Sequence, residues 1–165
     1  MFTLSRIASP LGDLLAVTHG ETLHALDFAG FDARLQRLFA RHHPGATLTE
    51  GNAPSRIAAA FAAYFAGHLA ALDSLTVAAI GSDFQRRVWA ALRAIPAGET
   101  RSYGQLAAAI GQPSASRAVG LANGANPIGI VVPCHRVIGA AGALTGYAGG
   151  VERKAWLLRH EGALL

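Results

Sequence analysis

Hydrophobic and polar residues alternate in short runs through the first part of the chain. The runs at 2–4, 14–17 and 23–28 are each as long as a short strand, and Pro10, Gly12 and Gly20 stand between them. Alternation of this kind, broken by Pro and Gly, is typical of antiparallel strands joined by tight turns. We therefore expect residues 1–30 to form a small antiparallel sheet.

The spacing of hydrophobic residues changes to that of helices after residue 30. Asp32 can cap a helix over residues 33–42. Pro54 stands at the start of a second helix that ends near Ala66, after a short strand expected at 47–49. Residues 69–80 are interpreted as a linker. The pattern therefore predicts an N-terminal α/β domain over 1–80 that supports a second domain over 81–165.

The second domain is expected to be mainly helical. A helix over 84–93 has Ser82 or Asp83 as its N-cap. Two further helices, at 102–111 and 115–124, are joined by a short turn that contains Gly, and Ser102 is expected to cap the first of them. This is the outline of a helix-turn-helix. The fold class predicted for the whole chain is α+β, with an antiparallel sheet in the first domain and a winged-helix-like arrangement in the second.

The helix expected at 115–124 has an unusual composition for a helix that reads DNA. Ser114 can cap it, and Arg117 and Asn123 are its polar side chains among Ala and Gly. Base reading in the major groove needs several long polar side chains. Small residues with one Arg are better suited to close approach to a groove and insertion of a single side chain.

The single cysteine of the chain follows an apolar run. Residues 130–132 are expected to form a buried strand or extended segment, and Pro133 ends any ladder because it lacks an N–H donor. A lone cysteine is more often a small buried hydrophobic residue than a nucleophile. Having His135 next to Cys134 decides little, because adjacent side chains of an extended segment point to opposite faces.

Composition narrows the class of protein. The chain has 165 residues, 52% hydrophobic and 15% charged, which is a globular composition. One cysteine excludes an internal disulfide and any all-cysteine metal site, so a reducing cytoplasm is expected. We expect no signal peptide, no membrane-spanning segment and no association with a membrane.

The net charge of +4 is unevenly distributed. Residues 1–80 carry five Arg and six acidic residues, whereas residues 81–165 carry eight Arg and one Lys against four acidic residues. A basic second half beside a nearly neutral first half indicates a polyanionic partner for the second half.

Taken together, the motifs from Phe84 to Gly162 resemble the O6-alkylguanine-DNA alkyltransferases. The most specific of them are Pro133-Cys134-His135-Arg136 and Arg117-Ala118-Val119-Gly120, with Leu157-Leu158-x-His160-Glu161-Gly162 near the end of the chain. The resemblance implies DNA repair by direct reversal. In that family an O6-alkylated guanine is flipped out of the duplex and its alkyl group moves irreversibly to a cysteine of the protein. O4-alkylthymine is a second candidate substrate.

The resemblance assigns roles to individual residues. Cys134 matches the nucleophile, His135 the histidine that deprotonates it through a water, and Glu161 the carboxylate that orients the histidine. This is the logic of a nucleophile, a base and an orienting third group.

Further residues match the DNA-binding and pocket positions of the family. Arg117 matches the arginine that fills the gap left by the flipped base, and Tyr103 a tyrosine beside the target phosphate that donates to the guanine ring. The expected backbone contacts are Ser102 and Ser116, with Asn123 a further DNA-binding residue. Asn126 would brace the cysteine segment, and Val137, Tyr147 and Ala148 would line the pocket.

The last predictions concern cofactors, metals, the oligomeric state and the binding partner. We expect no cofactor and no metal, and a monomer that binds double-stranded DNA through the minor groove. The alternative is a non-enzymatic helix-turn-helix protein, or a protein that only flags lesions, in which Cys134 is structural or senses redox state.

Overall fold

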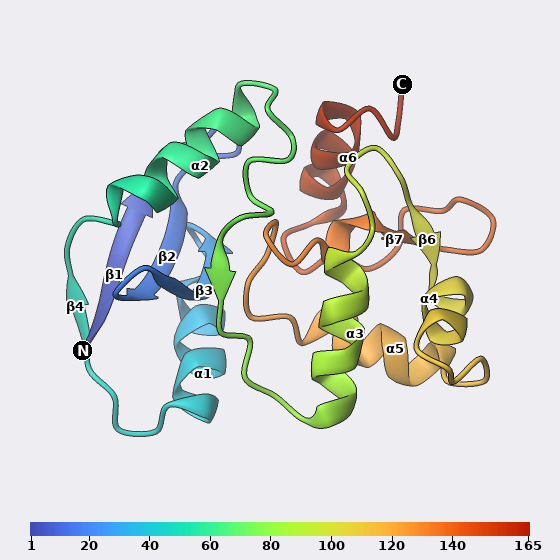
Figure 1. The fold of residues 1–165 in the computed structure, drawn as a ribbon, viewed down its shortest axis with the longest axis horizontal. Helices are drawn as coiled ribbons and strands as arrows, with labels where there is room; N and C mark the ends of the chain where they lie inside the picture. Colours follow the sequence, from blue (N-terminus) through green and yellow to red (C-terminus); the bar gives the residue numbers. More distant parts are fainter. The chain divides into compact units, whose positions relative to one another are not determined.

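The computed structural model describes residues 1–165, which form two compact units (Figure 1). The first unit contains residues 1–80 together with Pro127–Val131, and the second contains residues 81–126 and 132–165. The sequence interpretation had placed Pro127–Val131 with the second half. The structure groups this segment with the first unit, where the Pro127 carbonyl accepts from the Leu26 amide at 3.0 Å.

The first unit is built on a five-stranded sheet with the order β4-β1-β2-β3-β5. Its strands are β1 (Phe2–Ile7), β2 (Leu14–His19), β3 (Thr22–Phe28), β4 (Leu48–Glu50) and β5 (Thr76–Val77). The antiparallel pairing of β1, β2 and β3 is confirmed. The two edge strands run parallel to their neighbours, so the sheet as a whole is mixed and the predicted antiparallel strands form its centre.

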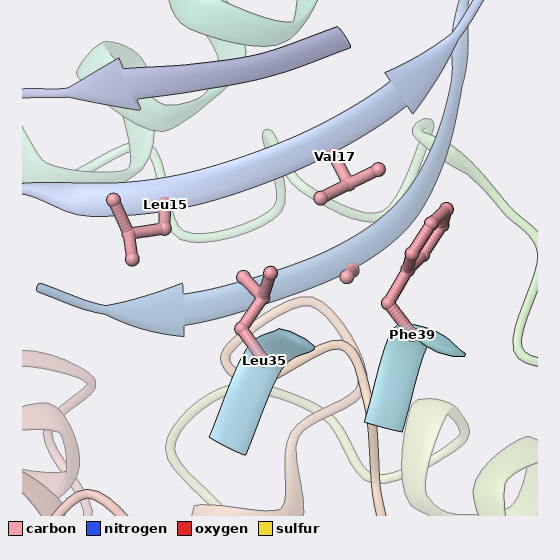
Figure 2. Packing of buried hydrophobic residues seen from close by; sticks show 5 residues of the cluster. Leu15, Val17, Leu35 and Phe39 are labelled. Atoms are coloured by element: carbon pink, nitrogen blue, oxygen red, sulfur yellow. The ribbon is translucent and has the colours of Figure 1, made fainter. Parts of the chain in front are cut away.

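A helix packs its apolar face against this sheet. Leu35 and Phe39 of α1 (Asp32–His42) point toward Leu15 and Val17 of β2, as Figure 2 shows. All four side chains are buried. The second helix of the unit, α2 (Ser55–Phe65), follows Pro54 as expected and buries Ile57, Phe61 and Tyr64.

The second unit contains the predicted helix-turn-helix. Its elements are α3 (Asp83–Arg93), β6 (Arg101–Ser102), α4 (Tyr103–Ala109), α5 (Ser116–Gly124), the short 3₁₀ helix η1 (Cys134–Arg136), β7 (Val137–Ile138) and α6 (Val151–His160). The α4–turn–α5 pair is confirmed, and so is the α+β class of the chain. The indole N–H of Trp89 in α3 donates to the Ala122 carbonyl of α5 at 2.9 Å and holds these two helices together.

Two of the predicted helix caps are confirmed and two are wrong. Ser82 and Ser102 each form a capping box with the Gln three residues later. Asp32 instead lies inside the first turn of α1 and accepts from the Gly30 amide. Ser114 lies outside α5, whose N-cap is Ala115 with no side-chain cap. Short polar side chains before a helix can hydrogen-bond to the backbone in several alternative turns. The sequence alone therefore does not determine which residue caps the helix.

The segment before Cys134 is not a strand, which corrects the expectation from its apolar run. Its backbone bonds are local: the Val131 amide donates to the Gly129 carbonyl and the Cys134 amide to the Val132 carbonyl. Ile130 has a φ of 67°, an unfavourable conformation for a β-branched residue. Because Cys134 and His135 lie on a 3₁₀ helix with about three residues per turn, their side chains are not held on opposite faces.

Candidate active site

The three residues of η1, Cys134, His135 and Arg136, are buried together. Cys134 is 9% exposed, and the side chains of His135 and Arg136 are buried behind it. Burial of two ionisable side chains is costly unless they are paired and hydrogen-bonded. The partners of His135 and Arg136 therefore decide what this site can do.

Glu161 is the partner of both residues. His135 Nε2 lies 2.9 Å from Glu161 Oε2, and Arg136 donates to both oxygens of the same carboxylate, from Nε at 2.8 Å and from Nη2 at 2.9 Å. Arg136 Nη1 also donates to the Ile95 carbonyl at 2.7 Å. The carboxylate is thus held in a fixed orientation by a bidentate arginine.

The backbone of Glu161 is placed by the end of α6 and by a turn that approaches its carbonyl oxygen closely. Glu161 is the C-cap of α6. Gly98 has a φ of 92°, and a Cβ at this position would lie 3.0 Å from the Glu161 carbonyl oxygen. A side chain at position 98 would therefore be strained by its own backbone and would displace Glu161.

The pKa values of this network follow from burial and pairing. Burial alone would raise the pKa of Glu161, but the hydrogen bonds from His135 and Arg136 outweigh it and hold that pKa well below its usual range. Burial lowers the pKa of the His135 imidazole, and the hydrogen bond and charge of Glu161 offset this only in part. At neutral pH the arrangement is therefore a neutral imidazole beside an ionised carboxylate.

This charge state fixes the tautomer of His135. An ionised carboxylate can only accept hydrogen bonds, so the ring proton of His135 lies on Nε2. Nδ1 is then the basic nitrogen, and it is buried with no hydrogen-bond partner among the protein atoms. The site therefore presents a bare imidazole nitrogen on the residue next to Cys134, where it can accept a proton.

The two asparagines of the site both hold the cysteine segment. Asn126 Nδ2 donates to the Val132 carbonyl at 2.7 Å, where it can brace the approach to Cys134. Asn123 was expected to contact DNA, but its side chain is only 4% exposed and its Nδ2 lies 3.4 Å from the Cys134 carbonyl. The structure thus places Asn123 on the inner side of α5 and not on its outer surface.

The other expected DNA-binding residues lie at the helix-turn-helix. Arg117 is exposed on α5, whereas Ser102, Tyr103 and Ser116 are half-buried. The ring of Tyr103 lies beside Gly120, where an added Cβ would meet it at 3.8 Å. A Cβ on Gly104 would lie 3.7 Å from Ser116 Oγ and 3.9 Å from Ser102 Oγ, so both hydroxyls flank the same glycine at the starts of α4 and α5.

The expected pocket residues lie around a loop that follows β7. The carbonyl of Val137 accepts from Lys154 Nζ at 2.5 Å, and that of Tyr147 accepts from the Gly150 amide at 2.9 Å. Tyr147 is half-buried and Ala148 is exposed. The Val137 carbonyl is thus already hydrogen-bonded to Lys154.

Lys154 is a site residue that the sequence interpretation missed. It is fully buried in α6, and its ammonium also donates to the Thr145 carbonyl at 2.7 Å, so it ties the loop to β7. Burial lowers the pKa of Lys154, and the negative charge that the Cys134 sulfur carries once ionised opposes that shift. Lys154 is the only lysine in a chain of thirteen arginines. A lysine in a chain that otherwise uses arginine as its cation was the sequence signal for a special role of Lys154.

Lys154→Met is expected to slow alkylation of Cys134 at neutral pH. The change removes the cation that favours the thiolate, and a shift of one pKa unit lowers the thiolate fraction about tenfold. The rate of reaction with a free alkylated base should recover as the pH rises. Arg159→Met, which removes an exposed cation from the same helix, should leave the pH–rate profile unchanged. A profile unmoved by Lys154→Met would contradict this role.

No group of three or more His, Cys, Asp or Glu side chains is placed to hold a metal ion. None of the helices is long and apolar enough to cross a membrane.

Comparison with known proteins identifies the family to which this fold and site belong. The fold and site define a helix-turn-helix protein whose one cysteine is buried beside a hydrogen-bonded His–Glu pair. Residues 83–163 match the model of the 6-O-methylguanine DNA methyltransferase DNA-binding domain. The methylated-DNA–protein-cysteine methyltransferase of Salmonella typhimurium is 54% identical over 163 residues, which cover 97% of this chain and 95% of the relative.

Solved structures agree with the sequence relatives. The crystal structure of Mycobacterium tuberculosis OGT in complex with DNA aligns with a TM-score of 0.83 and 45% identity, covering 98% of this chain and 93% of that one. A curated relative from Mycobacterium tuberculosis is 49% identical over 157 residues, covering 94% of this chain and 89% of the relative. The chain belongs to the methylated-DNA–protein-cysteine methyltransferase family.

Proposed function

We propose that the protein repairs DNA by transferring a methyl or larger alkyl group from the O6 atom of guanine to Cys134. The observation that carries this proposal is the His135–Glu161 hydrogen bond, which leaves a bare, buried Nδ1 on the residue beside the only thiol. Family membership supplies the reaction class. The protein is a single-turnover alkyltransferase, and O4-alkylthymine is a second candidate substrate.

The chemistry requires one bond to form and one to break. His135 Nδ1 takes the thiol proton through a water, and the resulting imidazolium is stabilised by Glu161, which stays ionised. The Cys134 sulfur then attacks the alkyl carbon, and the electrons of the O6–carbon bond pass to the guanine ring. The ring gains a proton from the Tyr103 hydroxyl, and the proton held by the His135 imidazolium returns through water to the Tyr103 oxygen, so no net proton is gained or lost. The thioether formed has no route back to a thiol, so each molecule reacts once.

The DNA must deliver a flipped base to a buried sulfur. Extruding a base costs a few kcal/mol of stacking and pairing, so the exposed Arg117 is assigned to the gap that the base leaves. Ser102 and Ser116 are assigned to the phosphates near the turn, where backbone contacts fix the register of the protein on the duplex. Asn126 and Asn123 hold the cysteine segment, and Val137, Tyr147 and Ala148 line the pocket.

The small residues of α5 favour approach through the minor groove, and the basic second half of the chain favours duplex DNA as the partner. We further propose that the protein acts as a monomer in the cytoplasm with no cofactor, and that the first unit supports the second. The alternative of a redox-sensing cysteine is disfavoured because sensor cysteines are solvent-accessible, whereas Cys134 is buried.

The proposal is tested by counting repaired bases. Duplex DNA with a single O6-methylguanine is incubated in excess over the protein, and the DNA is digested to nucleosides for chromatography. The expected result is conversion of one O6-methylguanine to guanine per protein molecule, followed by no further reaction. Either continued turnover or no conversion by folded protein would contradict a consumed cysteine.

Arg117→Ala is expected to slow repair of duplex DNA by about tenfold to a hundredfold, because unstacking that is no longer compensated costs a few kcal/mol. Reaction with free O6-benzylguanine should change little, since no base has to be extruded. Arg159→Ala removes the same charge from an exposed position of α6 and serves as the control. Equal losses on duplex and free base would remove Arg117 from this role. The measurement is the second-order rate constant on each substrate.

A further inference from the structure

The outer face of α5 carries one large apolar side chain. Leu121 is 73% exposed, whereas the other exposed large hydrophobic residues lie at chain ends, at the end of the first unit or at the first position of α6. Its neighbours on the exposed face are Arg117, Ala118 and Gly124. Arg117 and Leu121 are thus the only long side chains on a face that is otherwise flat.

Isolated exposed leucines are common on protein surfaces and need no explanation by themselves. Leu121 differs because of its position relative to Arg117. Residues four apart on a helix lie on one face, with Cβ atoms about 5–6 Å apart. A surface that accepts the Arg117 side chain must therefore also meet Leu121. The inner face of α5 is already packed through Val119, Ala122 and Asn123, so Leu121 is not needed for the core.

The spacing of the two side chains matches the spacing of base pairs. Base pairs rise about 3.4 Å per step along each strand, so a side chain 5–6 Å from Arg117 lies one to two base pairs from the extruded nucleotide. The minor-groove edge of an A·T pair presents only acceptors, whereas G·C adds the exocyclic amine of guanine. An apolar side chain can lie on the floor of an A·T step, but over G·C it buries an amine that it cannot pair.

We propose that Leu121 is a minor-groove wedge that makes repair depend on the base pairs beside the lesion, with A·T flanks favoured over G·C flanks. The inference rests on the proposed function, because the wedge acts only when α5 lies in the groove. Leucine is among the side chains that minor-groove proteins insert between base steps. The wedge adds a specificity determinant for sequence context, next to the Arg117 plug that serves extrusion itself.

The test compares methyl transfer from two duplexes that differ only in the two base pairs on each side of O6-methylguanine. The wild type, Leu121→Ala, Leu121→Met and the control Ile80→Ala, which shortens an exposed aliphatic side chain of the first unit, are each measured on both duplexes and on free O6-benzylguanine. A·T flanks also make any base easier to extrude, so the quantity compared is the change in the A·T/G·C rate ratio between variants.

The expected result is that Leu121→Ala lowers the A·T/G·C ratio by about fivefold, as loss of an apolar minor-groove contact predicts. Leu121→Met should retain most of the ratio because it keeps an apolar side chain, and all variants should react normally with the free base. The salt dependence of DNA affinity should stay unchanged in Leu121→Ala, since leucine releases no counterions.

Two results would overturn the inference. A ratio that is the same in Leu121→Ala as in the wild type and Ile80→Ala would show that flanking preference comes from the DNA alone. Absence of methyl transfer from both duplexes by the wild type would overturn the proposed function, and the wedge with it. The two failures are distinguishable because only the first leaves repair intact.

Discussion

Replacing Cys134 with serine is expected to abolish methyl transfer completely while DNA binding is retained. Serine has nearly the same shape, so the buried site at η1 can keep its packing. A hydroxyl is a far weaker nucleophile than a thiolate, and the neutral His135 can lower its barrier only modestly. The chain has no other cysteine that could accept the group.

Two measurements separate loss of chemistry from loss of fold in this variant. Transfer is followed with labelled O6-methylguanine duplex, and affinity for the same duplex is followed by fluorescence anisotropy. Cys134→Ala serves as the matched variant because it removes the nucleophile without adding a hydroxyl. Both variants should bind the duplex about as tightly as the wild type. Labelled protein recovered from either one would contradict the assignment of Cys134.

Glu161→Gln is the second change with a large expected effect. The amide cannot hold the Nε2 proton of His135 as a carboxylate does, and it leaves the buried Arg136 guanidinium without its counter-charge. Breaking one side of a buried ion pair costs about 3–5 kcal/mol of stability. Loss of a correctly oriented base should lower the transfer rate by about a hundredfold or more. Glu152→Gln, at an exposed position of α6, should change neither quantity.

The stability effect of Glu161→Gln should depend on pH in one direction. Because the folded state holds the pKa of Glu161 below its usual range, its contribution is fully present above the unfolded value of about 4.3 and is lost as the pH falls through the folded value. The difference in unfolding free energy between wild type and variant should therefore be constant near neutrality and shrink below about pH 4. Urea unfolding at several pH values measures it. A difference that grows toward acid pH would contradict the ionised carboxylate.

Much of the fold could be predicted from hydrophobic spacing. The strands β1 to β3 and the helices α1 to α5 follow from runs with periods of two or of three to four residues. The short strand expected at 47–49 is confirmed as β4. The strand β5 and the parallel direction of both edge strands could not be predicted, because strands of two or three residues are defined by the neighbour they pair with and carry no period of their own. The apolar run at 130–132 was misread for a related reason. Burial makes such a segment apolar whether it is a strand or a turn.

The residues of the site could be predicted only where they belong to motifs that are specific to the family. Cys134, His135 and Glu161 came from a family resemblance, since no local pattern joins residues 26 positions apart. Arg136 and Lys154 carry charges that are expected at the surface, and only the fold shows that both are buried and hydrogen-bonded. Asn123 was expected to bind DNA because it is one of the few polar residues of α5. The structure instead turns it toward the cysteine segment.

Cys134 itself is expected to become the acceptor of the alkyl group. The most direct measurement is the intact mass of the protein after incubation with a duplex carrying O6-methylguanine, followed by mass mapping of its peptides. The expected result is a gain of one methylene mass, found only in the peptide that contains Cys134. An unchanged mass in folded protein, or a gain carried by any other peptide, would contradict it.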